Sequence, residues 1–440
     1  MPRLPSPPSF PRLPFGPDPL RRVRLPRNLA SVTTRGEEEP ARSAGMTKAS
    51  VDRIWRAAVD LYRSGVHPAL QLCVRRNGHV VLDRAIGHAR GNGPQDPPDA
   101  EKVPVTTGTP FCVYSTSKSV TAMVIHLLHE RGLLSIEDRV ADHMPEYAEH
   151  GKGEITIAHV LAHRAGVASL PRDVLDIDNL ANSELIVRAL AGVKPASKPG
   201  RMLAYHAVSG GFILGEIVHR VTGKTIREVL AESILDPLGF RWGNYGVSPE
   251  DVPEVGLSYV TGPRLLPPLS TLVTRVLSQP LDKVIETSND PRFLTGIVPS
   301  ANVVTNANEL SRFFEIFRRG GELDGVRVME PETIRRALTE QSHLEIDFSL
   351  GFPTRFSYGL MLGAQVLSLY GLDTQHAFGH LGLINIMGWA DPERGLAAGL
   401  VTSGKAILYP ELPRFYGVMQ TIASEVPKVP SSEMLITPPS

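Results

Sequence analysis

Ser115 and Lys118 have the residue types and the spacing of a nucleophile and its base. They form the only Ser-x-x-Lys sequence of the chain, at the expected start of a helix. Residues i and i+3 share one helix face, so the Lys118 ammonium is expected over the Ser115 hydroxyl. A serine hydroxyl becomes a strong nucleophile when a base accepts its proton, and a lysine can do so if burial lowers its pKa. The alternative is a serine that caps the helix beside a solvated lysine.

The helix that must carry this pair is predicted over about 115–131. An apolar stripe recurs there at helical spacing, and Gly132 ends it. The stripe consists of Val120, Met123, Val124, Leu127 and Leu128. A helix N-terminus carries partial positive charge and free N–H groups, which can stabilise a developing oxyanion. The helix would therefore both position Ser115 and assist acyl transfer.

Strands are predicted near both ends of the chain. ALQLCVRR and HVVLDRAIG flank Asn77-Gly78, a strong hairpin signal because both turn residues need positive φ. RFSYGLMLGAQ, QHAFGHLGLINIMGWA and GLAAGLVTS indicate later strands. The segment between them, about 135–345, is mostly helical in pattern. We therefore expect an α+β fold in which an antiparallel sheet (about 46–110 and 350–425) is flanked by helices and interrupted by a mainly helical part.

Residues 1–45 and 426–440 lie outside the predicted domain, which covers 46–425. The first segment is rich in proline and arginine, and this composition favours disorder. The second contains prolines from Pro427 onwards and is expected to be flexible. The first segment also lacks the apolar stretch of a secretory signal, so we expect a cytoplasmic protein.

Composition argues against two classes of protein. Lys+Arg and Asp+Glu both number 46, giving a formal net charge of zero, whereas nucleic-acid-binding proteins usually carry a basic excess. No apolar run approaches the roughly 18 residues of a transmembrane helix. Hydrophobic residues make up 42%, enough for a sizeable core. We expect a globular enzyme with a small-molecule substrate; nothing in the sequence specifies an oligomeric state.

The remaining motifs point to packing rather than chemistry. Cys73 and Cys112 lie in apolar, strand-like stretches and are expected to be buried and inert. His126 and His129 share a helix face but lack a third ligand, so no metal site is predicted. The chain has no Gly-x-Ser-x-Gly, Gly-x-Gly-x-x-Gly or Walker sequence. We therefore expect neither a metal nor a nucleotide cofactor.

Longer stretches resemble the serine β-lactamase and penicillin-binding-protein superfamily, in the class C β-lactamase-like branch that includes family VIII carboxylesterases. FCVYSTSKSVTAMVIHLLHERGLLSIEDRV is similar to the nucleophile helix of that branch. ITIAHVLAHRAGV, PGRMLAYHAVSGGFILGEIVHRVTGKTIREVLAESILDPLGF and AFGHLGLINIMGWADPERGLAAGLVTSG resemble its later motifs. The resemblance runs from about residue 50 to 425 and implies a β-lactamase/DD-peptidase-like fold.

The resemblance also implies roles for individual residues. Ser115 corresponds to the nucleophile and Lys118 to its proton acceptor. Tyr205 matches the tyrosine of the Tyr-x-Asn motif, which assists as general base, and His380-Leu381-Gly382 matches the Lys/His-x-Gly motif. The N–H groups of Ser115 and Leu383 are then implied as the oxyanion hole. A core tyrosine at 205 and a simple strand histidine at 380 are the alternatives.

Two positions depart from the pattern of the superfamily. Ala207 stands where the Tyr-x-Asn motif has the asparagine that helps to hold a β-lactam side chain. His380 replaces the lysine of Lys-Thr-Gly and presents less positive charge to a carboxylate at neutral pH. His206 either lines the pocket in place of the asparagine or only packs, and His163 is expected to shape a loop. The departures favour a neutral ester over a β-lactam.

The sequence therefore predicts a cofactor-free serine hydrolase. We expect a carboxylesterase that cleaves short-chain or medium-chain esters through an acyl-Ser115 intermediate. Acyl transfer to an alcohol, and hydrolysis of β-lactams or D-amino-acid peptides, are the alternatives within the same chemistry. A catalytically silent binding protein is the alternative outside it.

Overall fold

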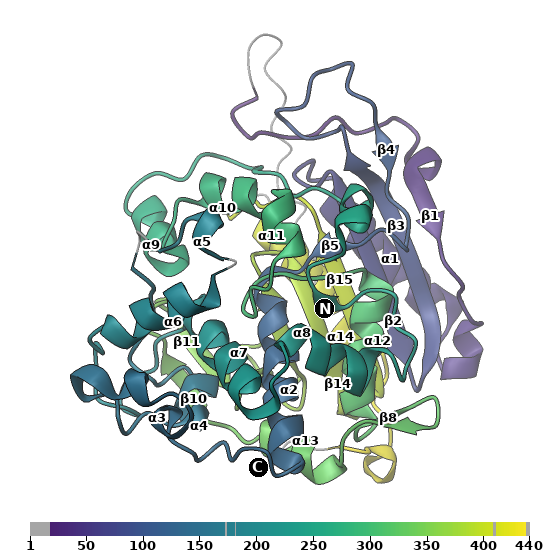
Figure 1. Ribbon diagram of the computed structural model, residues 1–440. Helices are drawn as coiled ribbons and strands as arrows, with labels where there is room; N and C mark the ends of the chain where they lie inside the picture. Colours follow the sequence, from purple (N-terminus) through teal and green to yellow (C-terminus); the bar gives the residue numbers. More distant parts are fainter. Residues whose placement is uncertain (1–17, 172–173, 181, 408–410, 437–440) are drawn as a thin grey trace.

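One antiparallel sheet, to which both ends of the chain contribute, forms the centre of the molecule (Figure 1). The structure, a computed structural model, describes residues 18–171, 174–180, 182–407 and 411–436. In these residues the sheet has ten strands, in the order β1, β3, β2, β15, β14, β13, β12, β11 and β10, with β4 paired to β3. The sequence-based expectation of an antiparallel sheet drawn from both ends is confirmed.

The strand bounds of this sheet show how short its outer members are. They are β1 Thr33–Arg35, β2 Ala69–Arg76, β3 His79–Arg90, β4 Val103–Pro104, β10 Ser342–Ile346, β11 Pro353–Phe356, β12 Met361–Leu362, β13 Phe378–Gly382, β14 Ile386–Asp391 and β15 Leu396–Thr402. The central strands are apolar and buried on both faces, as expected of strands that are covered by helices on each side.

The predicted hairpin joins β2 and β3. Asn77 and Gly78 both adopt positive φ, at 51° and 88°, as the two-residue turn requires. Side chains then alternate along β2: Leu72 faces one side of the sheet, and Cys73 faces the other. The register of the sheet is set at this hairpin, because a slip by one residue would exchange the two faces.

Helices cover both faces of the sheet. The first and last long helices, α1 (Lys48–Tyr62) and α14 (Glu411–Glu425), pack against each other and cover one face. The opposite face is covered by α12 (Ala307–Arg318). This helix packs close to the strands, and glycine at 388 makes this possible, since a Cβ there would lie only 2.4 Å from Phe314. The α12 segment, predicted as part of the inserted helical region, packs on the sheet instead.

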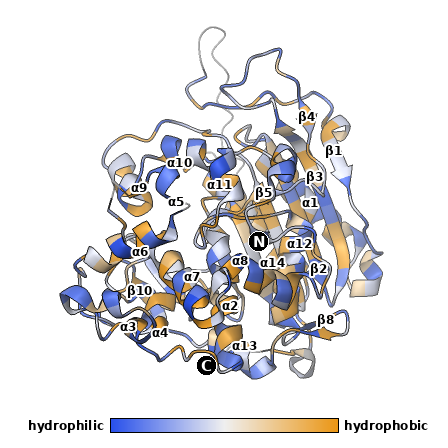
Figure 2. Cartoon of the chain, in the orientation of Figure 1, coloured by the Kyte–Doolittle hydropathy of each residue, from blue (hydrophilic) through white to orange (hydrophobic). Residues whose placement is uncertain are grey.

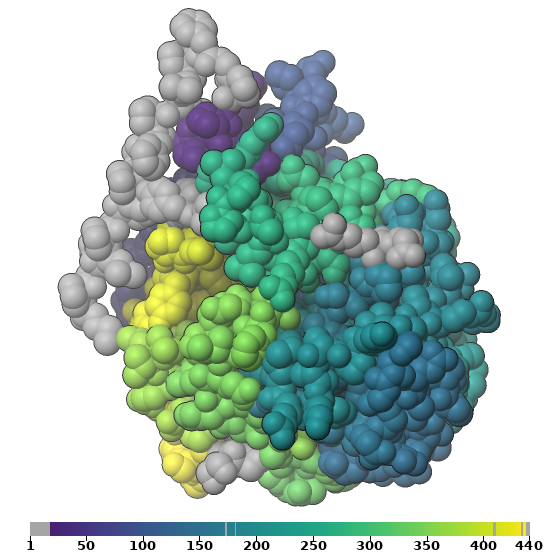
Figure 3. Space-filling model, turned by 90° about the vertical axis from the view of Figure 1, so that its left-hand side faces the viewer, coloured from purple at the N-terminus to yellow at the C-terminus, as the bar shows by residue number. Residues whose placement is uncertain are grey.

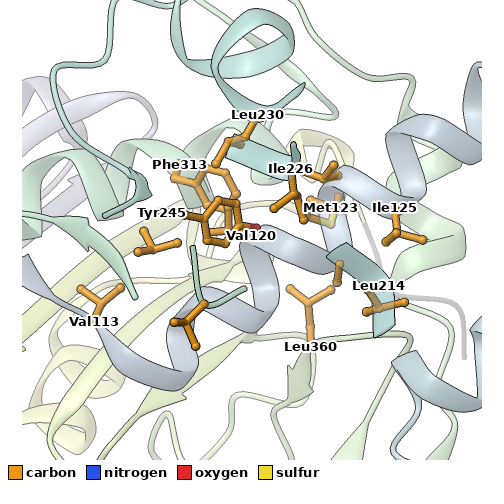
Figure 4. Close-up of a cluster of buried hydrophobic side chains, with 14 of the residues drawn as sticks. Val113, Val120, Met123, Ile125, Leu214, Ile226, Leu230, Tyr245, Phe313 and Leu360 are labelled. Atoms are coloured by element: carbon orange, nitrogen blue, oxygen red, sulfur yellow. The ribbon is translucent and has the colours of Figure 1, made fainter. Parts of the chain in front are cut away.

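The inserted part is built around helix α2 (Ser117–Glu130), whose residues are buried from its start to Leu128. Its other helices are α3 Val140–His143, α4 Ile157–Leu161, α5 Ile177–Leu180, α6 Ser183–Gly192, α7 Ser209–Thr222, α8 Ile226–Leu230, α9 Leu269–Leu277, α10 Leu281–Ser288, α11 Pro291–Thr295 and α13 Pro331–Ala337. Apolar residues recur along these helices (Figure 2), and a cluster of buried apolar side chains joins α2 to several of the other elements (Figure 4). Among them, Val120 and Met123 come from α2 and Ile226 and Leu230 from α8 (Figure 4).

Short strands form two further small sheets. β5 (Phe111–Cys112) and β6 (Asn244–Tyr245) each pair with β7 (Val303–Thr305), and β8 (Glu322–Leu323) pairs with β9 (Val326–Arg327). β5 leads directly into the turn before α2. The start of α2 is therefore fixed by backbone pairing as well as by the burial of the helix.

The prediction of disorder for residues 1–45 is wrong for the part that the structure describes, 18–45. Strand β1 pairs with the edge strand β3, with Thr33 opposite Ile86. Glu38 then accepts two hydrogen bonds from the Arg84 guanidinium, at 2.6 and 2.8 Å. Backbone pairing and this bidentate contact offset the entropy that the segment loses on ordering, although its composition favours disorder. Residues 1–17 lie outside the described residues.

The expectation of a flexible tail is also wrong for residues 426–436. Val426 and Ile436 are buried in the two main cores, and the N–H of Val429 donates to the Glu393 carbonyl. Apolar side chains among the prolines provide this anchorage. Residues 437–440 lie outside the described residues. In the parts of the chain that the structure describes, no helix is long and apolar enough to cross a membrane.

Candidate active site

Ser115 lies in a tight turn between strand β5 and helix α2. A 3₁₀ turn, Tyr114–Thr116, comes first, and the α-helix begins at Ser117 rather than at Ser115. Tyr114 has a φ of +48°, a conformation that is uncommon for residues other than glycine. Its buried side chain is anchored by a hydrogen bond of 2.7 Å to the Ser288 hydroxyl. This anchored, strained residue sets the direction in which Ser115 projects.

The Lys118 ammonium meets the Ser115 hydroxyl, as the i, i+3 spacing predicts. Its Nζ lies 3.0 Å from Ser115 Oγ. Nζ also donates to the backbone carbonyls of Ala207 at 2.7 Å and Ser300 at 3.1 Å. Burial removes hydration from the ammonium and lowers the pKa of Lys118 to about 7, and no carboxylate among the described residues compensates for this loss. The alternative of a solvated lysine is therefore wrong.

Tyr205 lies beside this pair. Its hydroxyl is close enough to Ser115 to influence the pKa of the phenol, and its ring centroid is 4.9 Å from Lys118 Nζ. Burial raises the pKa of the Tyr205 phenol, so the side chain carries its proton at neutral pH. In this state Tyr205 can donate a proton to a leaving group more readily than it can accept one.

His380 and Gly382 lie on strand β13, next to the turn that bears Ser115. The His380 carbonyl accepts a hydrogen bond from Thr116 Oγ1 at 3.3 Å. A Cβ on Gly382 would lie 2.3 Å from the Val113 carbonyl oxygen, so only glycine allows this approach of strand and turn. The structure thus brings the His380-Leu381-Gly382 motif next to the Ser-x-x-Lys motif.

The His380 side chain is buried and neutral. Its Nδ1–H donates to the Leu381 carbonyl at 2.8 Å, so Nε2 carries the lone pair. Burial, and secondarily the charge of Lys118, lowers the pKa of His380 to about 3. The position that holds a lysine in the Lys-Thr-Gly motif therefore contributes no positive charge at neutral pH.

The N–H groups of Ser115 and Leu383 are free to bind an oxyanion. No acceptor is found for either N–H in the described part of the chain. Leu383 follows β13 and lines the same pocket as Ser115. The next two residues, Ile384 and Asn385, both have positive φ, which marks a constrained turn at this point.

His163 and His206 form a buried pair behind Tyr205. Their Nδ1 atoms are 3.3 Å apart, and His163 Nδ1 also accepts the backbone N–H of His206 at 3.2 Å. Because His163 Nδ1 is thus an acceptor, His206 Nδ1 carries the proton and its Nε2 the lone pair. This Nε2 has no partner among the described residues. His206, His163 and Lys118 all line a small cavity of about 20 Å³, room for one water molecule.

Two residues lie closer to this site than the sequence predicts. His163 is expected to shape a loop, yet its ring centroid lies 4.8 Å from that of Tyr205. Asp347 receives no role, yet its carboxylate binds the Tyr205 backbone. The motif around His163 was a usable signal, because it lies in one of the stretches that resemble the superfamily. For Asp347 no local pattern offers a signal.

A mainly apolar pocket opens beside Ser115. It contains about 790 Å³ of empty space, part of it open to solvent. Helices α5, α9, α10 and α11 contribute six of its sixteen lining residues, and Tyr205, Val208 and Leu383 are among the others. No described residue of the wall carries a formal charge; its polar members are Tyr114, Ser115, Tyr205, Gln279, Thr287 and Ser288. Such a pocket suits an apolar acyl or alkyl group.

The residues predicted to be inert do not line the pocket beside Ser115. Cys73 and Cys112 are buried free thiols, and burial raises the pKa of both to about 12. His126 contacts the Tyr358 carbonyl, and His129 accepts the N–H of Ile136. Within the described ranges, no group of three or more His, Cys, Asp or Glu side chains could hold a metal ion.

Comparison with solved structures finds the same fold in proteins of known class. A penicillin-binding-protein homologue from Caulobacter crescentus superposes with a TM-score of 0.72 at 25% identity, covering 87% of this chain and 99% of the other. A family VIII carboxylesterase gives a TM-score of 0.71 at 25% identity, covering 85% and 98%. The predicted β-lactamase/DD-peptidase-like fold is confirmed.

Comparison with curated sequences finds an enzyme with two activities in its name. The Esterase/beta-lactamase LipL of Mycobacterium tuberculosis is 28% identical over 353 residues, which cover 75% of this chain and 76% of that protein. Together with the carboxylesterase neighbour, it identifies a serine hydrolase. Residues 51–410 match the family described as Beta-lactamase, a span of most of the chain. The protein belongs to the Beta-lactamase family.

Proposed function

We propose that the protein is a carboxylesterase that cleaves esters of apolar, short-chain or medium-chain acids. The observation that carries this proposal is the contact of 3.0 Å between Lys118 Nζ and Ser115 Oγ at the base of an uncharged, apolar pocket. Burial lowers the pKa of Lys118 to about 7, so a neutral amine is available near neutral pH. An amine in that state can accept the hydroxyl proton of Ser115.

Acylation follows from this geometry. Ser115 Oγ attacks the ester carbonyl carbon while its proton moves to Lys118 Nζ, and the carbonyl π electrons move onto the oxygen. The N–H groups of Ser115 and Leu383 stabilise this oxyanion. When the tetrahedral intermediate collapses, the C–O bond to the alcohol breaks. The Tyr205 hydroxyl, whose pKa is raised by burial, donates a proton to the leaving alkoxide and regains one from Lys118.

Deacylation uses the same groups. A water molecule attacks the acyl-Ser115 carbonyl and gives a proton to neutral Lys118. Collapse of the second intermediate breaks the bond to Ser115 Oγ, which recovers the proton. The apolar wall formed by α5, α9, α10 and α11 holds the acyl chain during both steps.

Two features disfavour β-lactams as the main substrate. The His380 ring is neutral, so it offers no cation to the carboxylate that most β-lactams carry. Ala207 has no side-chain amide to bind the acylamino group, and its carbonyl is already occupied by Lys118. The name of the relative, Esterase/beta-lactamase, combines both activities, so a low β-lactamase activity beside the esterase activity is compatible with this proposal.

Paired initial rates test this proposal. We expect turnover of p-nitrophenyl butyrate, little turnover of a chromogenic cephalosporin, and loss of ester turnover in Ser115→Ala. A fluorophosphonate should label Ser115 in the wild type and leave Ser115→Ala unmodified. Faster cephalosporin than ester turnover would replace the proposal with a β-lactamase. An unlabelled wild type with no turnover of either substrate would identify a silent binding protein.

A further inference from the structure

Large apolar side chains are exposed mainly in two segments of the chain. Twelve such side chains are exposed among the described residues, and eight of them lie in residues 266–272 and 344–367. Six define what we call the apolar rim: Leu266, Leu272, Phe348, Phe352, Val366 and Leu367. Leu266 is 72% exposed and Phe348 63%. Scattered leucines on a surface are ordinary, whereas a cluster that includes two phenylalanines marks an interaction surface.

The apolar rim belongs to elements that surround the active site. Leu272 lies on helix α9, and Leu277 of the same helix lines the pocket beside Ser115. Phe348 and Phe352 lie in the loop between β10 and β11, and the N–H of Phe348 donates to the Leu203 carbonyl, two residues before Tyr205. Val366 and Leu367 lie in the connection from β12 to β13, the strand of His380.

These segments lie on one face of the molecule. In Figure 3, residues near 260–280, in green, and residues near 345–370, in yellow-green, both face the viewer and approach each other. The segment around 200, in teal, lies beside them on the same face. The hydrogen bond between Phe348 and Leu203 ties the yellow-green and teal segments together. The segments that bear the rim therefore lie on the same side of the protein, next to the segment that leads to Tyr205.

The same face carries positive charges that have no partner within the described part of the chain. Lys198, Arg201, Arg264 and Arg275 are exposed, and none forms an ion pair or a side-chain hydrogen bond with another described residue. Residues 194–203 and 260–280, which contain them, include neither an aspartate nor a glutamate. Elsewhere on the surface, arginines are commonly paired, as Arg220 is with Glu146 and Glu216.

We propose that this face docks on an anionic lipid surface. The phenylalanines and leucines of the rim would enter the boundary between headgroups and acyl chains, while the four cations contact lipid phosphates. Charge complementarity selects this partner, because a second copy of the chain would bring like charges together. Docking places the apolar pocket against the lipid, so a substrate acyl chain passes from membrane to pocket with little exposure to water.

Flotation with lipid vesicles tests the proposal. We expect wild-type protein and Ser115→Ala to float equally with vesicles of phosphatidylcholine and phosphatidylglycerol in equal amounts, and weakly with phosphatidylcholine alone. Arg264→Glu/Arg275→Glu and Phe348→Ser/Phe352→Ser should each lower the partition coefficient by about tenfold or more. Added salt should weaken binding of the wild type. The double variants leave the pocket intact, so their rates on dissolved p-nitrophenyl acetate should equal the wild-type rate.

Control variants distinguish binding through this surface from nonspecific adsorption to vesicles. Leu133→Ser removes an exposed leucine that follows helix α2, and Lys48→Glu reverses an exposed charge on α1. Both should float like the wild type. The proposal is overturned if wild-type protein does not float, or if the control variants lose as much binding as the rim variants. A dimer in sedimentation that Phe348→Ser/Phe352→Ser dissociates, with no flotation, would assign the face to a second copy. The use of Ser115→Ala keeps these outcomes independent of the esterase proposal.

Discussion

The carboxylate oxygen Oδ1 of Asp347 accepts a hydrogen bond from the backbone N–H of Tyr205 at 3.1 Å. The same oxygen accepts the N–H groups of Ser349 and Leu350, at 2.8 and 2.9 Å. Asp347 is completely buried, and burial raises the pKa of its carboxyl group. One side chain, 142 residues away in sequence, therefore fixes the backbone that carries the phenol next to Ser115.

We predict that Asp347→Ala lowers kcat for ester hydrolysis by about 10–100-fold, because a buried N–H without an acceptor costs about 1–3 kcal/mol and Tyr205 would shift. KM should change little, since Asp347 does not line the pocket. Asp347→Asn retains an acceptor oxygen and should keep most of the activity. Steady-state kinetics on p-nitrophenyl butyrate, with thermal melts of each variant, measure this. Equal losses in both variants would show that the carboxylate's charge matters rather than its hydrogen bonds.

The titration of Lys118 predicts the pH dependence of activity. Acylation needs the neutral amine, and burial lowers the pKa of Lys118 to about 7. We therefore expect kcat/KM to rise with pH through a midpoint near 7 and then to level off. Rates measured in constant-ionic-strength buffers between pH 5 and 9 check this. Lys118→Ala should be nearly inactive at every pH; a variant that keeps the wild-type profile would remove Lys118 from the mechanism.

The same lysine affects stability in a predictable direction. Its folded-state pKa is about 7 and its ordinary value is 10.5, so between these values the unfolded chain binds more protons. The free energy of unfolding should therefore gain a contribution that increases from pH 7 to pH 10.5. Urea unfolding at several pH values measures it, with Lys118→Met as the comparison. The free energy of unfolding of the wild type, relative to that of Lys118→Met, should therefore increase as the pH rises. A difference that does not change with pH would contradict the lowered pKa.

Local patterns in the sequence predict much of the fold. The Asn77-Gly78 hairpin and the helix after Ser115 follow from turn chemistry and from helical periodicity, which depend only on near neighbours. The order of residues 18–45 could not be predicted in this way. It depends on the pairing of Thr33 with Ile86 on an edge strand and on the Glu38–Arg84 contact, which composition does not report.

For the candidate site, too, local sequence patterns predict one part, and the other part depends on long-range packing. The i, i+3 geometry of Ser115 and Lys118 is a local property and is confirmed as a contact. The place of His163 next to Tyr205, and the hold of Asp347 on that tyrosine, arise from packing across long stretches of chain. The neutral state of His380 likewise depends on burial that only the folded structure provides. The catalytic roles of these residues stay predictions.

Gly382 is predicted to be irreplaceable. A Cβ there would lie 2.3 Å from the Val113 carbonyl oxygen, so Gly382→Ala must push β13 away from the turn that holds Ser115. We expect kcat/KM for p-nitrophenyl butyrate to fall by about 100-fold or more, because a displaced strand misplaces the oxyanion N–H of Leu383.

Gly417 provides the matched control for this substitution. It lies inside helix α14, and a Cβ there would meet no atom within 4 Å. Gly417→Ala should leave activity unchanged and raise stability by about 0.5–1 kcal/mol, since alanine favours the helix. Near-normal activity of Gly382→Ala would mean that β13 and the Ser115 turn can separate without harm to the site.

Leu277 is predicted to limit the length of the acyl chain. It lies at the end of α9 and faces the pocket that also contains Ser115 and Val208. In Leu277→Trp the larger ring should occupy the distal part of this space, because pockets discriminate chain length by excluded volume. We expect kcat/KM for p-nitrophenyl octanoate to fall by about tenfold, and that for the acetate to stay within about twofold. Val276→Trp alters the neighbouring residue of the same helix, outside the pocket wall, and should change neither rate. If both variants lose octanoate and acetate activity together, α9 acts on the site through its fold and not as the wall that receives the acyl chain.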